Sequence, residues 1–186
     1  MTPADAITLL APAVTRTGGT WLDLGAGAGT FTRALASLLG GTGRVVAVER
    51  DPAALQALRL LAREAELEGR VEVLEGDLQA VDRVPGIHER RYDGALLANV
   101  LHFLAGPASI LAGVAKLVRP GAAVVIIEYE REAANRYVPH PLPLAALQRA
   151  AAGAGLGMPR VVGRRPSLWQ GEMYCAVLPV GIRPDG

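Results

Sequence analysis

Short continuous apolar runs alternate along the chain with longer stretches in which apolar residues recur at helical spacing. The runs predict strands at 20–24, 44–49, 70–77, 92–99 and 122–129. The stretches predict helices at 30–39, 53–66, 106–118 and 142–153. The β-branched run at 44–49 is typical of a strand buried on both faces. This alternation of strand and helix favours an α/β fold with a parallel sheet.

The two ends of the chain depart from that alternation. Residues 5–14 predict a short helix that breaks near Pro12, and residues 80–91 predict a loop or short helix. Apolar stretches at 159–163 and 173–178 predict a hairpin that closes the sheet with an antiparallel last strand. Arg164, Arg165 and Trp169 lie in this hairpin, where they would contact an anionic or aromatic substrate or remain solvated.

Composition narrows the class of protein. The 186 residues are 51% apolar and 20% charged, which favours one globular domain, with a helical segment at 1–17 and a core at 18–180. A net charge of +1 gives no global basic field for nucleic acid or membranes. The single cysteine, Cys175, excludes an intrachain disulfide. With no secretory pattern and no long apolar run, we expect a cytoplasmic monomer or homodimer that does not bind membranes.

A glycine-rich turn joins the first predicted strand to the first predicted helix. It reads Gly25-x-Gly27-x-Gly29, and glycines there can adopt positive φ and bring backbone N–H groups close to a ligand. The positive end of the following helix dipole points at the same place. A dinucleotide fingerprint would need glycine at position 30, where Thr30 stands. This departure argues against the rival hypothesis of a nicotinamide-dependent oxidoreductase.

Polar residues follow the carboxyl ends of the next strands. Glu49 ends the second strand, where a carboxylate can accept hydrogen bonds from both ribose hydroxyls. Asp77 and Asn99 end the third and fourth strands, although Asp77 after a glycine also suits a turn cap. Because these ends share one rim of an open α/β sheet, the residues predict one binding crevice.

Taken together, these motifs resemble the class I S-adenosylmethionine-dependent methyltransferases. The resemblance rests on Asp23 before the glycine run, on Asp77, on the segment 99–104, which is similar to the fourth motif of small-molecule methyltransferases, and on the Arg-Pro-Gly turn at 119–121. It implies a Rossmann-like, doubly wound seven-stranded sheet, mostly parallel with an antiparallel last strand and helices on both faces. It also implies S-adenosylmethionine as the cofactor and S-adenosylhomocysteine as the product.

The resemblance assigns a set of cofactor-binding positions. Asp23 would face the methionine ammonium, Asp77 would accept the adenine amino proton, and Leu78 would lie beside the ring. The full set comprises Asp23, Gly25, Ala26, Gly27, Gly29, Thr30, Glu49, Arg50, Asp77, Leu78 and Asn99.

Residues of the acceptor side are harder to assign. His102 is the first candidate for a catalytic base, and the alternative is that it caps or packs in its loop. Glu128 and Tyr129 end the fifth strand and are candidates for substrate binding. Tyr137 and His140 lie in the segment 135–141, which is either a substrate lid or an ordered loop.

The sequence also disfavours several reactions. The carboxylate set of magnesium-dependent relatives is not evident, so we expect no metal. Residues 99–102 read Asn-Val-Leu-His, without the Asn-Pro-Pro-Tyr motif of amino-directed nucleic-acid enzymes. The expected function is therefore methyl transfer to a small-molecule acceptor, with nucleic acid an improbable partner. The alternative is a cofactor-binding protein or partner subunit without catalysis of its own.

Overall fold

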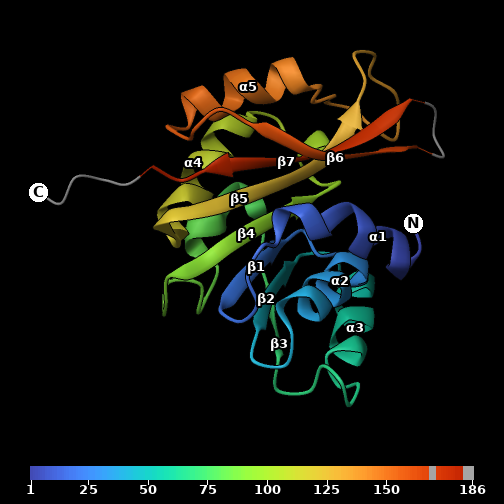
Figure 1. Cartoon of the computed structure of the whole chain (residues 1–186), viewed down its shortest axis with the longest axis vertical. Helices are drawn as coiled ribbons and strands as arrows, with labels where there is room; N and C mark the ends of the chain where they lie inside the picture. Colours follow the sequence, from blue (N-terminus) through green and yellow to red (C-terminus); the bar gives the residue numbers. More distant parts are fainter. Residues whose placement is uncertain (168–170, 182–186) are drawn as a thin grey trace, which may run out of the picture.

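The computed structural model describes residues 1–167 and 171–181, so Trp169 lies outside the described residues. A seven-stranded sheet is covered by helices on both faces (Figure 1). The strands are β1 (Thr20–Leu24), β2 (Arg44–Glu49), β3 (Val71–Glu75), β4 (Tyr92–Ala98), β5 (Val118–Glu130), β6 (Arg160–Pro166) and β7 (Glu172–Pro179). The α-helices are α1 (Pro3–Leu10), α2 (Thr30–Leu39), α3 (Pro52–Leu61), α4 (Pro107–Leu117) and α5 (Leu144–Gly153), and the 3-10 helices are η1 (Ala11–Ala13), η2 (Leu78–Arg83) and η3 (Leu101–Phe103).

The strand order is β3-β2-β1-β4-β5-β7-β6. Strands β1 to β5 pair in parallel, and β7 pairs antiparallel with both β5 and β6. The chain runs outward from β1 to β3 and then returns to place β4 on the other side of β1. This reversal is the topological switch point at which open α/β sheets bind ligands. The predicted doubly wound sheet with an antiparallel last strand is confirmed.

Alternate residues of the central strands fill two apolar layers. In β5, Val124 and Ile126 face the layer covered by α4 and α5, whereas Val125 and Ile127 face the layer of α1, α2 and α3. All four side chains are fully buried. Burial on both faces explains why the central strands read as continuous apolar runs rather than as alternating patterns.

Among the predicted boundaries that differ from the structure, two have a clear physical reason. The helix expected at 53–66 ends at Leu61. A continued helix would turn Leu67 away from the face of Leu61, whereas the turns that follow bury Leu67 in the core. The fifth strand begins at Val118 rather than at residue 122, because Val118 pairs with Tyr92 before the register shifts.

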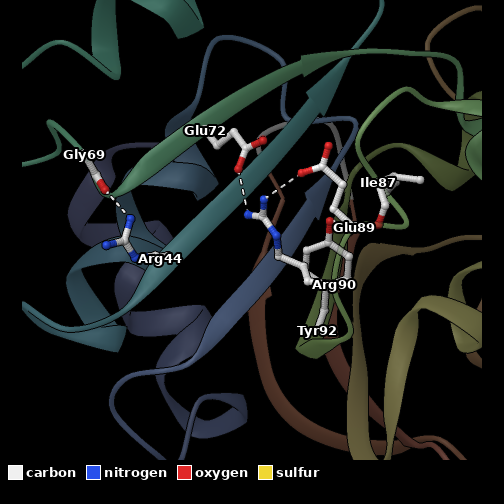
Figure 2. Close-up of polar contacts among 7 residues, drawn as sticks. All are labelled: Arg44, Gly69, Glu72, Ile87, Glu89, Arg90 and Tyr92. Carbon is white, nitrogen blue, oxygen red and sulfur yellow. Dashed lines mark hydrogen bonds and ion pairs between the residues drawn. The ribbon is translucent and has the colours of Figure 1, made fainter.

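Polar contacts hold the edge strand β3 and the segment that follows it (Figure 2). The Arg90 guanidinium donates to Glu72 of β3 at 2.7 Å and to Glu89 at 3.4 Å. The Tyr92 hydroxyl donates to the Ile87 carbonyl at 3.0 Å, and Arg44 donates to the Gly69 carbonyl. These contacts fix the segment between η2 and β4 against the sheet.

In the described part of the chain, no helix combines the length and the apolar character needed to cross a bilayer.

Candidate active site

A pocket of about 270 Å³ lies at the carboxyl ends of β1, β2, β3 and β4. It contains most of the predicted cofactor positions, together with apolar side chains that the sequence did not single out. The lining includes Gly25, Gly27, Glu49, Arg50, Asp77, Leu78, Asn99, Val100, Phe103 and Leu104. The remaining predicted positions, Asp23, Ala26, Gly29 and Thr30, are not part of this lining. Predicted residues from four strand ends therefore share one crevice.

The glycine loop is held against β2 by its own backbone. The N–H groups of Gly25 and Ala26 both donate to the Val48 carbonyl, at 2.9 and 3.1 Å. Gly25 and Gly27 adopt φ values of 75° and 56°, a region that favours glycine. A Cβ at Gly25 would overlap the Val100 side chain, whereas a Cβ at Gly27 would point into open space. Gly27 is therefore the position at which a ligand can approach the backbone.

Glu49 joins the glycine loop to the end of β2. Its Oε2 accepts the Gly27 N–H at 2.8 Å, and its Oε1 accepts the N–H groups of Arg50 and Asp51 at 2.7 and 2.9 Å. A carboxylate has about four lone-pair sites, so these three bonds leave some capacity for a ligand hydroxyl. Glu49 therefore holds the glycine loop in place, in addition to its predicted contact with the ribose hydroxyls.

Asp77 is the N-cap of η2 and pairs with Arg50. Its Oδ1 accepts the Gln79 N–H at 2.9 Å, and its Oδ2 accepts from the Arg50 guanidinium at 2.9 Å. The Gln79 N–H and, to a lesser degree, Arg50 hold the pKa of this carboxyl below its usual range. Asp77 therefore stays ionised at neutral pH, beside the buried Leu78 side chain.

Asp23 does not line the pocket and is hydrogen-bonded to α2. It is 1% exposed, and the Thr32 hydroxyl donates to its Oδ2 at 2.6 Å. Burial raises the pKa of Asp23 to about 7, and the nearby charge of Glu49 adds to the shift. The Asp23 carboxyl thus joins β1 to α2, and its contact with the methionine ammonium stays a prediction.

Asn99 occupies the junction of two hollows. It has a φ of 54°, and its buried Oδ1 has no hydrogen-bond partner among the described residues. Besides the pocket, it lines a recess of about 70 Å³ whose other walls include Tyr129, Arg165 and Met173. A buried carbonyl oxygen without a partner is costly, so this atom is well placed to accept a bond from a ligand.

His102 and Glu128 form a buried pair beneath this junction. Glu128 Oε2 lies 2.7 Å from His102 Nδ1, and its Oε1 accepts the His102 backbone N–H at 3.2 Å. Both side chains are at most 3% exposed. The predicted substrate residue Glu128 therefore holds His102 in place. The ring of Tyr129 lies 5.4 Å from the His102 ring, between the pair and the recess.

The predicted residues Tyr137 and His140 lie in the loop between β5 and α5. The His140 N–H donates to the His102 carbonyl at 2.9 Å, which ties this loop to the turn after β4. Tyr137 is exposed, as is Phe103, which sequence reasoning missed. An apolar residue directly after the fourth motif was the available signal for Phe103.

A larger cavity, of about 550 Å³, lies at the opposite edge of the sheet. It is lined by residues that precede β1 and β5, including Arg16, Trp21 and Arg119. It contains none of the predicted site residues. Because ligands of open α/β sheets bind at the carboxyl ends of the strands, we place the active site in the smaller pocket.

The chain matches the family described as "Methyltransferase domain" over residues 22–124. This match covers more than half of the chain, including the glycine loop, Glu49, Asp77 and Asn99. The fold and the family together define a methyltransferase. The chain belongs to the methyltransferase domain family, whose members use S-adenosylmethionine, and is an enzyme of that class.

Curated relatives share sequence with part of the chain. A protein of Rhodopseudomonas palustris named ribosomal RNA small subunit methyltransferase A is 35% identical over 123 residues, which are 66% of this chain and 41% of the relative. The protein of the same name from Methylobacterium radiotolerans is 36% identical over 67% of this chain and 40% of its own length. The chain thus spans about 40% of the length of these relatives.

Solved structures share the fold at lower identity. An S-adenosylmethionine-dependent methyltransferase from Aquifex aeolicus is 20% identical with a TM-score of 0.68, covering 95% of this chain and 98% of that chain. A glycopeptide N-methyltransferase complexed with sinefungin is 16% identical with a TM-score of 0.72, covering 97% of this chain and 94% of that chain. These likenesses concern the fold alone.

The comparisons correct one expectation. The near-neutral net charge led us to expect a small-molecule acceptor and to treat nucleic acid as an improbable partner. Relatives at 35% identity are named as RNA methyltransferases, so that expectation is wrong. The physical reason is that net charge averages over the whole surface, whereas a nucleic acid contacts only the part of the surface around a site.

Proposed function

We propose that this chain transfers the methyl group of S-adenosylmethionine to RNA. The observation that carries the proposal is the 35% identity with ribosomal RNA methyltransferases over two thirds of the chain. Because the chain spans about 40% of those relatives, the proposal concerns the substrate class and not a particular nucleotide.

The pocket residues fit the proposed cofactor. Gly27 leaves open space where a side chain would stand, which suits close approach of the methionine moiety. The carboxylates of Glu49 and Asp77 suit the ribose hydroxyls and the adenine amino group, and Leu78 and Leu104 suit the flat faces of the ring. When bound, the sulfonium supplies an electrophilic methyl group. Glu49, Asp77 and the glycine loop would hold it at the switch point.

Asn99 is the residue that we assign to the acceptor. Asn99 lines both the cofactor pocket and the recess beside Tyr129, and its buried Oδ1 has no hydrogen-bond partner among the described residues. An acceptor atom there suits an N–H donor such as the amino group of a base, and holding that group supplies the alignment that methyl transfer requires. The recess of about 70 Å³ suits the edge of a base rather than a large substrate.

The attacking nitrogen must lose a proton as its bond to the methyl carbon forms. We assign this proton to the His102–Glu128 pair, a buried imidazole and carboxylate next to Tyr129, which lines the recess. Glu128 binds both Nδ1 and the backbone N–H of His102, which fixes the orientation of the ring. Water in the recess can carry the proton the remaining distance.

Methyl transfer from tritiated S-adenosylmethionine tests the proposal. Label should enter RNA, including ribosomal RNA, and should become soluble after ribonuclease treatment. Label in a small-molecule extract, with none in RNA, would contradict the assignment.

A matched pair of variants tests the role of Asn99. Glycine tolerates its φ but lacks the carbonyl, whereas aspartate also tolerates this φ and keeps an acceptor oxygen.

We expect Asn99→Gly to lower kcat by about a hundredfold, since it removes an oriented polar contact to the reacting group. Asn99→Asp should retain more activity than Asn99→Gly, and the affinity of both variants for S-adenosylhomocysteine should fall less than kcat. Equal activity of Asn99→Gly and the wild-type protein would remove Asn99 from the acceptor site.

A further inference from the structure

The exposed Phe103 ring lines the cofactor pocket, and an exposed tyrosine and an arginine lie in a loop that is hydrogen-bonded to the turn of Phe103. We call Phe103, Arg136 and Tyr137 the aromatic rim. Phe103 lies in η3, after β4, and the other two lie in the loop between β5 and α5. The exposed fraction is 52% for Phe103 and 48% for Tyr137. Large apolar side chains at this exposure mark a surface that contacts another molecule when they gather beside a site.

The loop that presents Arg136 and Tyr137 has a defined local structure. The Asn135 side-chain oxygen accepts the N–H groups of Tyr137 and Val138, at 2.9 and 2.7 Å. The backbones of Asn135 and Val138 are also hydrogen-bonded to each other in both directions. The Val138 side chain is buried and anchors the turn. Residues 136 and 137 are therefore held at the tip of a fixed turn.

The same turn is joined to the active site. The His140 N–H donates to the carbonyl of His102, whose ring lies 4.1 Å from that of Phe103. Phe103 in turn lines the cofactor pocket. The loop is therefore hydrogen-bonded to η3, and η3 borders the cofactor pocket.

Charge at the rim complements the aromatic rings. The Arg136 guanidinium lies over the Tyr137 ring, 4.5 Å from its centre, and also donates to the Tyr137 hydroxyl. Within residues 1–167 and 171–181, no carboxylate pairs with Arg136 or with Arg131 at the start of the loop. Arg164 and Arg165 of β6, in contrast, pair with Glu172, Glu130 and Asp5. A cation without a carboxylate partner, over an exposed aromatic ring, suits phosphate and bases together.

We infer that the aromatic rim binds single-stranded RNA next to the target nucleotide, with flanking bases stacked on Tyr137 and Phe103 and a phosphate held by Arg136. The inference rests on the proposed function, and it names the segment of the surface that holds the RNA. Single strands are favoured over duplexes because only unpaired bases offer their faces to aromatic side chains. The rim also explains how a chain of net charge +1 can bind RNA, since it needs only a local contact.

Fluorescence anisotropy of a labelled single-stranded oligoribonucleotide, measured with saturating S-adenosylhomocysteine, tests the inference. Tyr137→Ala removes the ring, and Tyr137→Phe keeps it. Arg136→Gln removes the charge. Met158→Ala is a matched control, because Met158 is also an exposed apolar residue, with an exposed fraction of 72%. It lies away from the pocket: its neighbour Gly157 is hydrogen-bonded to Pro179, which pairs with Ala123 in the first half of β5.

We expect Tyr137→Ala to weaken RNA binding by about five- to a hundredfold, whereas Tyr137→Phe and Met158→Ala stay within about twofold of wild type. Arg136→Gln should lower the slope of log affinity against log salt by about 0.7, the value for one phosphate contact to a single strand. The affinity for S-adenosylhomocysteine should be unchanged in all four variants, since none of these side chains lines the cofactor pocket.

The outcomes separate this inference from the proposed function. If the wild-type protein methylates RNA and Tyr137→Ala binds RNA as tightly as wild type, the aromatic rim is not the RNA-binding surface, and the proposed function still stands. Equal binding of a duplex and a single strand would overturn the single-strand assignment. Absence of both binding and methylation of RNA, with S-adenosylhomocysteine still bound, would overturn the proposed function and the rim with it.

Discussion

The Asp23 carboxyl group lies in the core, where the Thr32 hydroxyl donates a hydrogen bond to it. Removal from water disfavours the charged form, which is why burial raises its pKa to about 7. The folded protein therefore binds a proton at this carboxyl more tightly than the unfolded chain, in which the pKa is near 3.8. Between these two pKa values, the contribution of Asp23 to the free energy of unfolding falls as pH rises.

Replacing Asp23 with asparagine tests this linkage, because the amide oxygen can still accept from Thr32 but cannot ionise. We expect Asp23→Asn to be more stable than wild type above pH 7 by roughly 1–4 kcal/mol, with the difference vanishing near pH 4. Urea denaturation of both proteins at about pH 4, near the pKa of the unfolded chain, and at about pH 8, above the pKa of the folded protein, measures the difference. The same difference at both pH values would contradict a buried, titrating Asp23.

Other residues of the site owe their positions to partners that are distant in the sequence. Arg50 reaches Asp77, and Glu128 reaches His102 across 26 positions. The amino acid types at these positions suggested polar roles, but nothing local indicates which side chains would meet. In the structure, Glu128, which was predicted to bind substrate, is hydrogen-bonded to His102, the predicted base.

Among the secondary-structure elements, the turn from β1 to α2 shapes the site most directly. Its glycines have similar backbone conformations but different surroundings. Gly25 lies against Val100, whereas Gly27 faces open space at the pocket. Two substitutions of one kind can therefore separate the fold from ligand binding.

Gly25→Ala and Gly27→Ala form this matched pair. Both place alanine at positive φ, which costs roughly 1–2 kcal/mol. Gly25→Ala also forces Val100 to move, so we expect it to lower the melting temperature more than Gly27→Ala does. Gly27→Ala should instead weaken S-adenosylhomocysteine binding, because its methyl group occupies the ligand space. Thermal denaturation and calorimetric titration measure the two effects, and a reversed order would contradict the assigned surroundings.

The exact ends of helices and strands cannot all be predicted from the local pattern of apolar residues. The strand and helix types were predicted correctly from apolar periodicity, because each element must bury one face or both. The end of α3 and the start of β5 differ, since they depend on how Leu67 packs and on the pairing of Val118 with Tyr92. Neither contact can be inferred from the neighbouring residues.

For the whole molecule, ligand binding should be visible as added stability. A ligand that binds only the folded state stabilises it by about 2.7 kcal/mol at a concentration one hundred times its Kd. For a chain of this length, that corresponds to a rise in melting temperature of roughly 5–10 °C. We expect S-adenosylhomocysteine to produce this rise and NADH to produce none, because Thr30 replaces the third glycine of a dinucleotide site.

Asp77→Ala is the control for this measurement. Its carboxylate lies at the pocket surface and is half exposed, so its removal should reduce the thermal shift while leaving the melting temperature of the free protein within a few degrees. A full shift with Asp77→Ala would exclude Asp77 from the cofactor site. A shift with NADH equal to that with S-adenosylhomocysteine would revive the oxidoreductase hypothesis.

The sequence by itself determined the α/β class, the hairpin that closes the sheet, and the rim on which Gly25, Gly27, Glu49, Asp77 and Asn99 meet. These features follow from local physics: periodic burial, turn chemistry and the shared edge of parallel strands. Only the tertiary structure decided that Asp23 is hydrogen-bonded to α2, that His102 is buried on Glu128 and that Phe103 and Tyr137 are exposed. Burial and pairing of single side chains depend on residues far away in the chain, and those contacts exist only once the sheet has assembled.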